Sequence, residues 1–268
     1  MPAKKFIHLY LMVCLAAVWP FSAQGGQSQS EKPCSISIQD LTQIRGLEDT
    51  ALVDVRNASD YQIYQVPGSI NIKLHELKAK TFLKNKRLVL VGYGYDSEKL
   101  LEACKALKSF GFQSVRVLDN GIAGWAITKD QSIDSPHIIQ SVFYINPADI
   151  AHIENTSRIL VIDLTGKNSN PLNNYFEHIT TITAPNNDAA KTLSKIQTSN
   201  NQQYGYVIVV DEDGQGYPSL YSLNHSNNKI PVMFLSGGIS GLQDFEAQKT
   251  AMTNKKEFTL QNLKGCEN

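Results

Sequence analysis

Residues 88–99 read LVLVGYGYDSEK, and this stretch decides the fold class. Residues 88–91 are typical of a buried strand, the glycines and tyrosines that follow indicate a tight loop, and an apolar helical pattern begins at Leu100. Strand, tight loop and helix in succession are typical of α/β domains, which place nucleophiles and anion-binding backbone N–H groups in such loops. This loop contains no cysteine, arginine or Ser–His pair. It resembles an active-site loop without a nucleophile.

The rest of the chain continues this alternation. In the first half we predict strands at 51–55, 70–72, 87–91 and 114–118, and helices at 38–43, 74–83, 97–110 and 122–127. In the second half the clearest strands are 159–163, 206–211 and 232–235. Apolar strands that alternate with helices predict an α/β fold with parallel sheets covered by helices on both faces.

The chain also repeats itself in order. The segment Ser37-Ile38-Gln39-Asp40-Leu41 recurs as Asn146-Pro147-Ala148-Asp149-Ile150, and both indicate a capped helix start. The strand ending at Asp54 recurs as the strand ending at Asp163. We therefore expect two related domains, at 35–130 and 143–250, joined by a linker at 131–142 and followed by a tail at 251–268.

The first 25 residues are interpreted as a signal peptide. Lys4 and Lys5 precede an apolar stretch at 6–18 that is too short to span a membrane comfortably, and Ala23-Gln24-Gly25 offers small residues for cleavage. An uncleaved membrane anchor is the alternative. The interpretation predicts a bacterial periplasmic or secreted protein with no membrane contact after cleavage.

Three cysteines remain in the mature chain: Cys34, Cys104 and Cys266. Cys34 and Cys266 lie in polar segments near the two ends, whereas Cys104 lies on the apolar side of a helix. Disulfides persist in an oxidising compartment, so we expect a Cys34–Cys266 disulfide with Cys104 buried and free. Three unpaired thiols are the alternative.

Composition argues against several classes of function. The chain has 268 residues, of which 42% are hydrophobic and 19% charged, as in globular proteins. Without residues 1–25 it carries 23 basic and 25 acidic residues and has no basic run, which argues against nucleic acid as a partner. The histidines are scattered, so no metal site is expected, and no cofactor is predicted.

Four segments of the first half resemble the successive motifs of the rhodanese-like domain. They are Asp54-Val55-Arg56, then 66–72 (VPGSINI), the strand that ends at Val91, and 117–125 (VLDNGIAGW). The second half resembles that family through Asp163, His178-Ile179, the strand at 207–210 and Gly237-Gly238. The resemblance implies two tandem rhodanese-like domains, the first at 35–130 and a degenerate second one at 143–250.

Rhodaneses carry sulfane sulfur on a cysteine thiolate held in a loop of backbone N–H groups. Aligned back from Gly111, the cysteine position falls on Gly94 and the basic position on Lys99; aligned from the strand, the cysteine position falls on Gly92. In the second half the position falls between Asp211 and Asp213, around Glu212. Neither half supplies a cysteine there, so no catalytic residue is predicted.

Three interpretations of the first loop stay open. It binds a small anion or a protein partner through its N–H groups, with Lys99 and Arg56 supplying charge; or it is structural, with two tyrosines filling the pocket; or Asp96 and Ser97 have an unforeseen catalytic use. The degenerate loop comprises Gly92, Tyr93, Gly94, Tyr95, Asp96, Ser97 and Lys99, and the candidate binding residues are Asp54, Arg56, Gly94 and Lys99.

The function expected from the sequence is that of an exported, catalytically inactive rhodanese-like module that assists a redox or sulfur-handling partner. The alternative is an active sulfurtransferase that uses an unaligned cysteine such as Cys104.

Overall fold

The computed structural model describes residues 34–129, 133, 135–150, 153, 159–167, 171–176, 179–184, 191–192, 195, 206–217, 220–221 and 231–264. The chain divides into Met1–Lys32 and a compact unit, Pro33–Asn268, which contains every element described below. The signal peptide predicted at residues 1–25 lies outside the described residues. Among those described, no helix is long and apolar enough to span a bilayer.

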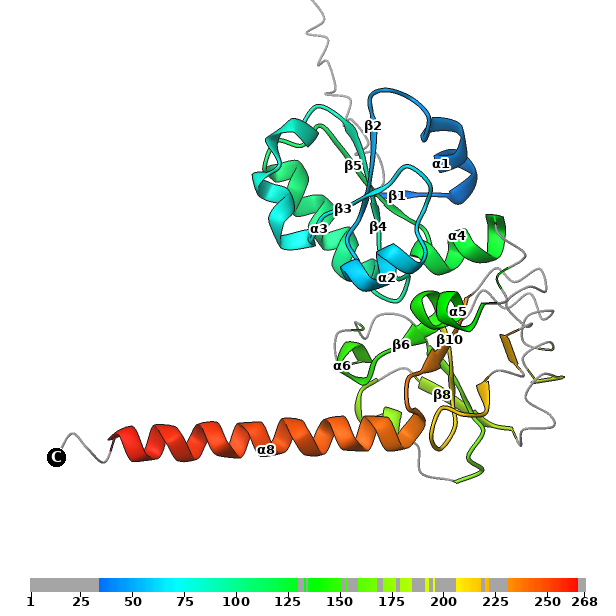
Figure 1. Ribbon diagram of the computed structural model, residues 1–268, viewed down its shortest axis with the longest axis vertical. Helices are drawn as coiled ribbons and strands as arrows, with labels where there is room; N and C mark the ends of the chain where they lie inside the picture. The colour runs from blue at the N-terminus through cyan, green and yellow to red at the C-terminus, as the bar shows by residue number, and fades with distance from the viewer. Residues whose placement is uncertain are drawn as a thin grey trace, which may run out of the picture. The chain divides into compact units, whose positions relative to one another are not determined.

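The first half contains a five-stranded parallel sheet in the order β1-β5-β4-β2-β3 (Figure 1). Its central strand β4 (Arg87–Val91) is the apolar run quoted first above. Leu88 and Leu90 pack on one face of the sheet, whereas Val89 and Val91 pack on the other. The remaining strands are β1 (Ser35–Ile36), β2 (Thr50–Asp54), β3 (Ile70–Asn71) and β5 (Ser114–Leu118).

Helices cover both faces of this sheet, as predicted. Helix α3 (Ser97–Ser109) packs on the face of Leu88 and Leu90, while α1 (Ile38–Ile44) and α4 (Gly121–Lys129) cover the other (Figure 1). The helix predicted at 74–83 is wrong, because the structure has two 3₁₀ turns there, η1 (Leu74–Ala79) and η2 (Thr81–Leu83). Helix α2 (Ala58–Ile63) was not predicted.

The second half repeats the same strand order in a second parallel sheet, β6-β10-β9-β7-β8. The predicted strands at 159–163, 206–211 and 232–235 are confirmed to within one residue as β7 (Ile159–Asp163), β9 (Tyr206–Val210) and β10 (Val232–Leu235). The helix start predicted at 146–150 is confirmed as α6 (Pro147–Ile150). Elements that were not predicted include β6 (Tyr144–Ile145), η3 (Pro171–Asn174) and β8 (Ile179–Thr183).

The linker predicted at 131–142 is largely helical instead. Helix α5 (Pro136–Phe143) starts with Pro136 in its first turn, where the missing N–H of proline costs no hydrogen bond. Its apolar residues, among them Ile139 and Val142, belong to one buried cluster that contains side chains from both sheets. The sequence interpretation took Pro136 for a break, although proline is also a common first helical residue.

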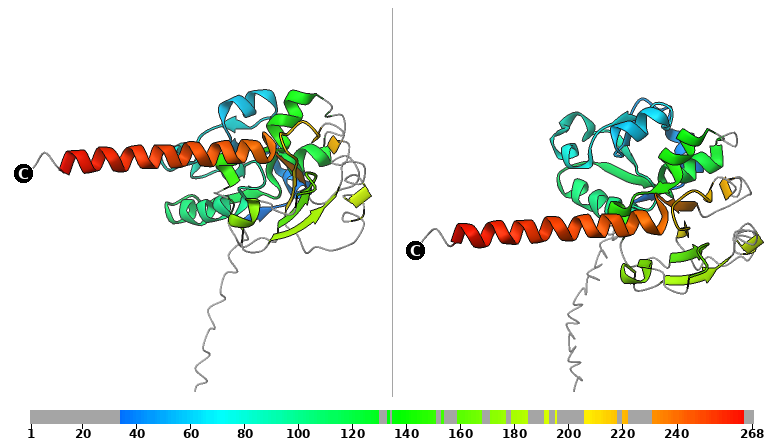
Figure 2. Two further views of the ribbon diagram at one scale, coloured as in Figure 1. Left: turned by 90° about the horizontal axis from the view of Figure 1, so that it is seen from below. Right: turned by 60° about the horizontal axis from the view of Figure 1, so that its bottom comes forward.

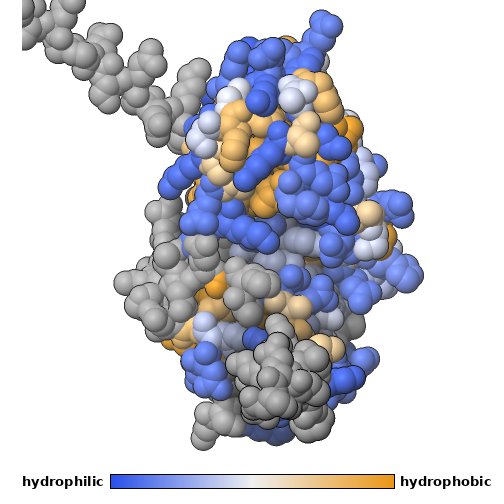
Figure 3. Space-filling view, turned by 90° about the vertical axis from the view of Figure 1, so that its left-hand side faces the viewer, coloured by the Kyte–Doolittle hydropathy of each residue, from blue (hydrophilic) through white to orange (hydrophobic). Residues whose placement is uncertain are grey.

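The predicted tail at 251–268 begins inside a helix. Helix α8 (Gly238–Lys264) runs without interruption past residue 250 in the views of Figures 1 and 2. On the face that Figure 3 shows, apolar areas are interrupted by hydrophilic side chains. Among the described residues, single apolar side chains such as Phe82 are well exposed.

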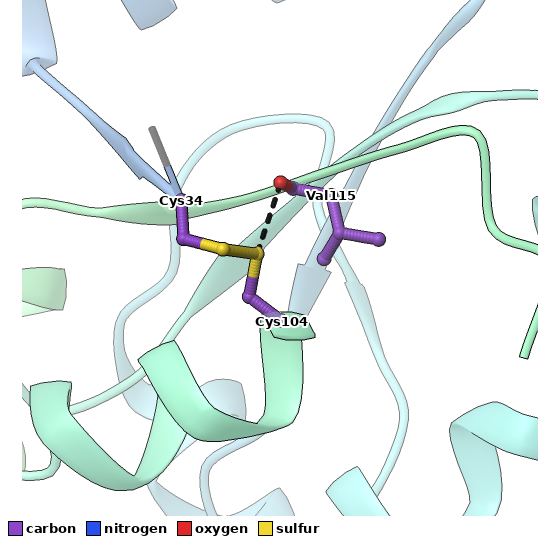
Figure 4. The surroundings of a disulfide bond; sticks show 3 residues. All are labelled: Cys34, Cys104 and Val115. Atoms are coloured by element: carbon purple, nitrogen blue, oxygen red, sulfur yellow. Dashed lines mark hydrogen bonds between the residues drawn. A yellow bond between two sulfur atoms is a disulfide. The ribbon is translucent and has the colours of Figure 1, made fainter. Parts of the chain in front are cut away.

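A disulfide was predicted between Cys34 and Cys266, but the structure gives Cys34 a different partner. Cys34 is bonded to Cys104, with their Cα atoms 6.1 Å apart, and Cys266 lies outside the described residues (Figure 4). Cys104 is fully buried as expected but is not a free thiol. The reason is topological: β1 pairs with β5, and α3 holds the Cys104 Sγ 3.2 Å from the carbonyl oxygen of Val115 in β5. Both cysteines therefore meet beside β5.

Candidate functional site

The loop predicted as the candidate site lies where the carboxyl ends of β2 and β4 adjoin. Val91 ends β4 and pairs in register with Asp54 at the end of β2. Residues 92–96 then turn directly into α3, which begins at Ser97. The structure thus brings together both groups of predicted residues, Asp54 with Arg56 and the loop from Gly92 to Lys99. This is the edge at which parallel α/β sheets bind ligands.

Asp54 and Arg56 form a buried ion pair. The Arg56 Nη2 donates to Asp54 Oδ2 at 2.8 Å and its Nε to Oδ1 at 3.1 Å, and both side chains are inaccessible to solvent. The Arg56 guanidinium also donates to the carbonyl oxygens of Tyr64 and Ser141. Most of its donors are therefore used within the protein. Asp54 therefore balances the charge of Arg56 inside the protein.

Two tyrosines form one wall of the site. The rings of Tyr93 and Tyr95 stack with their centroids 5.1 Å apart, and the Arg56 guanidinium carbon lies 5.6 Å from the Tyr93 centroid. Tyr93 donates a short hydrogen bond to Asp60, and Tyr95 donates to Asp149 at 3.1 Å. Burial, together with these carboxylates, raises the pKa of both phenols. Both tyrosines therefore stay neutral hydrogen-bond donors at neutral pH.

Asp96 turns its carboxylate back into the loop. The Gly94 N–H donates to Asp96 Oδ1 at 3.0 Å, and a Cβ atom placed on Gly92 would lie 2.5 Å from both carboxylate oxygens. Asp96 occupies the N-cap position of α3, but its side chain makes no capping hydrogen bond to the helix. Burial raises the pKa of this carboxyl, although the backbone N–H groups of Gly94, Asp96 and Tyr93 act in the opposite direction.

A pocket of about 180 Å³ opens beside this loop. The two tyrosines line it rather than fill it, and Lys99 contributes an exposed ammonium group. The Ser97 hydroxyl donates to the Gly94 carbonyl at 2.5 Å and thereby fixes the turn into α3. The pocket is lined by Val55, Arg56, Asn57, Leu74, Tyr93, Tyr95, Asp96, Lys99, Leu100 and Asp149.

The corresponding loop of the second half follows β9. Asp211 is buried, and its two carboxylate oxygens accept hydrogen bonds from Gly214 N–H at 2.5 Å and Gly216 N–H at 2.6 Å. Glu212 is exposed and pairs with Lys167 at 2.7 Å. Asp213 accepts a hydrogen bond from Gln215 N–H at 3.0 Å. Of the three predicted acids, one is therefore built into the loop and two face solvent.

Backbone hydrogen bonds establish which residues of the two loops correspond. Ile122 N–H donates to the Gly92 carbonyl at 2.8 Å, and Ile239 N–H donates to the Asp211 carbonyl at 2.9 Å. Each carbonyl belongs to the first residue after the central strand of its sheet. Gly92 and Asp211 are therefore structural equivalents. By the same comparison Asp163 corresponds to Asp54, because each accepts the backbone N–H two residues further on.

Asp163 lacks the partner that Asp54 has. Its Oδ1 accepts from the N–H and hydroxyl of Thr165 at 2.8 and 2.7 Å, respectively. Its Oδ2 is buried and has no hydrogen-bond partner among the described residues. Thr165 occupies the position in the second half that Arg56 occupies in the first. For the part of the chain that the structure describes, no group of three His, Cys, Asp or Glu side chains is placed to hold a metal ion.

Sequence reasoning missed three residues that shape the site. Asp60 and Asp149 anchor the two tyrosines, and Asn71 donates its side-chain N–H groups to the carbonyls of Asp54 and Arg56 at 3.0 and 2.9 Å. Asn71 lies within the recognised motif at 66–72, which could have pointed to it. Asp149 was noted only as part of a helix start, and no signal marked Asp60.

The class of fold is a parallel α/β domain with a tight loop between its central strand and the following helix, beside a buried Asp–Arg pair. Residues 37–128 match the rhodanese-like domain family. The uncharacterized protein YibN of Escherichia coli K12 is 33% identical over 106 residues, which cover 37% of this chain and 72% of YibN. The chain therefore belongs to the rhodanese superfamily.

Other similarities cover the same region. The adenylyltransferase and sulfurtransferase UBA4 of Meyerozyma guilliermondii is 28% identical over 109 residues, 37% of this chain and 25% of UBA4. Among solved structures, the BH2092 protein of Bacillus halodurans is 28% identical with a TM-score of 0.31, covering 35% of this chain and 71% of that one. The human single-domain sulfurtransferase TSTD1 is 20% identical with a TM-score of 0.31, covering 37% and 99%.

Proposed function

We propose that this protein is an exported rhodanese-like accessory module without sulfurtransferase activity, which assists a redox or sulfur-handling partner. The observation that carries the proposal is the identity of the residue after each central strand, Gly92 in the first half and Asp211 in the second. We take these as the positions of the family's cysteine, and the second half as a degenerate copy of the first.

The chemistry of sulfur transfer supports the assignment of inactivity. A thiolate must attack the outer sulfur of a donor such as thiosulfate, so that the S–S bond breaks and sulfite leaves with the electron pair. Gly92 offers no side chain for this attack. Asp211 offers a carboxylate, which is a poor nucleophile toward sulfur and repels an anionic donor. The relationship to UBA4, a sulfurtransferase, supports a partner in the same area of chemistry.

The binding role is assigned to the pocket beside the first loop. It combines apolar walls from Val55, Leu74 and Leu100 with tyrosine hydroxyl groups and the exposed Lys99. Such a mixture of apolar surface and a few fixed polar groups is typical of binding sites. In this proposal Arg56 and Asp54 hold the pocket in shape and do not contact the partner.

The Cys34–Cys104 disulfide supports export. Disulfides persist in the periplasm and outside the cell but are rare where glutathione and thioredoxin keep thiols reduced. One of the two bonded residues, Cys104, is fully inaccessible to solvent. Together with the features of residues 1–25, it favours a periplasmic or secreted protein.

The bond also argues against the alternative in which Cys104 carries sulfur. A disulfide sulfur is not a nucleophile, and a two-electron reductant would have to release the thiol first. The Cys104 side chain would then still be buried between α3 and β5. Sulfur transfer through Cys104 therefore needs both a reductant and an opening of the first half.

An assay of mature protein with thiosulfate and cyanide tests the proposal. We expect no thiocyanate above that formed by Cys266→Ser and Cys104→Ala, which serve as matched cysteine-loss controls. Activity in the wild type that disappears in either variant would overturn the proposal and identify the sulfur carrier. Repeating the assay after mild reduction distinguishes a thiol held in the disulfide from one that is always free.

A further inference from the structure

We infer that each half of this protein fills its own anion-binding loop with a carboxylate from the chain, Asp96 in the first half and Asp211 in the second. These resident carboxylates exclude external oxyanions such as sulfate and thiosulfate. The inference rests on the proposed function only in treating the two loops as rhodanese-type loops. It adds a residue in each half that determines which ligands the loop accepts.

In the first half the carboxylate occupies the space next to the strand end. A side chain at position 92 would start 2.5 Å from both Asp96 oxygens, so the two groups compete for one volume. The Gly94 N–H, which points into that volume, already donates to Asp96 at 3.0 Å. An external anion that approached the same N–H group would have to displace Asp96.

In the second half the carboxylate comes from the opposite end of the loop. Asp211 is the first residue after β9, whereas Asp96 is the last residue before α3. Its two oxygens nevertheless accept hydrogen bonds from two loop N–H groups, Gly214 and Gly216. Two unrelated positions thus bring the same chemical group to the N–H groups of equivalent loops.

The carboxylates of the chain are favoured over external anions at the loop N–H groups. Backbone N–H groups that converge in a loop favour an anion, and a carboxylate of the chain satisfies them without losing translational freedom. A dianion placed beside Asp96 or Asp211 meets carboxyl oxygens at contact distance and finds the N–H groups of Gly94, Gly214 and Gly216 already bonded to them. Lys99 is close enough to Asp96 to favour its charged form. The charge of Lys99 therefore already interacts with a carboxyl group of the protein itself.

The test compares Asp96→Ser with Asp213→Ser. Serine is a favoured N-cap residue, so α3 can still start at residue 97 after the first substitution. Asp213→Ser is the matched control, because it removes an equal charge from an exposed loop acid that also accepts one backbone N–H. Each protein is titrated with sulfate at constant ionic strength, with chloride as the balancing ion, while the amide NMR signals of Gly94 and Tyr95 are followed.

We expect no saturable shift in the wild type or in Asp213→Ser. In Asp96→Ser we expect a saturable shift whose affinity exceeds the upper limit set by the wild-type titration by roughly tenfold or more, because Asp96 no longer occupies the Gly94 N–H. Saturable sulfate binding at Gly94 in the wild type would overturn the inference. So would an Asp96→Ser protein that keeps its fold and α3 but binds no sulfate. The thiocyanate assay is independent of this result, so a failure of the proposed function is seen separately.

Discussion

Gly92 and Asp211 hold equivalent positions after the central strands of two sheets with the same strand order, yet one has no side chain and the other carries a buried carboxyl group. The first half compensates by bringing a carboxylate from Asp96 into the space that Gly92 leaves. Each loop therefore holds one carboxyl group, which a different residue supplies. Because the two halves have equivalent positions, the same substitution can be compared between them.

The first prediction compares Asp54→Asn with Asp163→Asn. Asp54→Asn leaves the Arg56 guanidinium buried without a counter-charge, so we expect a loss of about 3–5 kcal/mol in the free energy of unfolding. Asp163→Asn keeps an oxygen for Thr165 and removes a buried carboxylate with one unsatisfied oxygen, so its cost stays below about 1 kcal/mol. Urea unfolding measures both. Equal losses would show that Asp163 has a charged partner.

The second prediction concerns pH and the Asp96 carboxyl, whose pKa lies above its ordinary value of 3.8. A raised pKa means that the fold favours the protonated form. Its contribution to stability is present below the ordinary pKa and is lost as the pH rises through the raised value. Wild type should therefore lose stability relative to Asp96→Asn between about pH 4 and neutral pH. The opposite trend in urea unfolding would mean that the loop N–H groups outweigh burial.

The third prediction concerns the disulfide. Cys34→Ser, Cys104→Ser and the double variant should each lower the free energy of unfolding by a similar amount of about 2–4 kcal/mol, because each removes the same bond. Cys266→Ser should leave stability unchanged. Thermal unfolding measures the effect, and mass spectrometry of alkylated, non-reduced protein gives the pairing. Loss of the cross-link in Cys266→Ser would restore the pairing expected from the sequence.

The fourth prediction concerns a contact that fixes the first loop. A Cβ on Gly121 would lie 2.4 Å from the Gly92 carbonyl oxygen and 2.6 Å from the Gly94 nitrogen, and the φ of Gly121 is +52°. Gly121→Ala should therefore cost at least about 2 kcal/mol through strain and overpacking. Gly46→Ala, which meets nothing within 4 Å, is the control. A Tm for Gly121→Ala that matches this control would contradict the described loop contact.

The sequence was sufficient for the parallel sheets and for the position of the loop that follows β4. Strands such as β4 and β7 are short, nearly continuous apolar runs, a pattern typical of strands that are buried on both faces of a parallel sheet. The two-residue strands β1 and β6 are too short to leave a pattern. In η1, Leu74 and Leu77 are three residues apart, a spacing that suits both an α-helix and a 3₁₀ helix.

Long-range features could not be predicted from local pattern. The partner of Cys34 depends on which strand lies next to β1, and that neighbour, β5, is about eighty residues away in the chain. The return of Asp96 into the loop depends on the empty space at Gly92, because aspartate before a helix ordinarily caps it. The hydrogen bond from Tyr95 to Asp149 likewise joins two segments far apart in the chain, and neither segment has a sequence pattern that predicts this contact.

Under the export proposed above, the placement of the Cys34–Cys104 bond would set an order of maturation. The two cysteines are 70 positions apart and both belong to the first half, so the cross-link can form while the second half is still being translocated. Before oxidation the precursor lacks about 4 kcal/mol of stabilisation by loop-closure entropy. A reduced precursor would thus stay easier to unfold for passage through a membrane channel, and oxidation on the far side would commit it to its folded form.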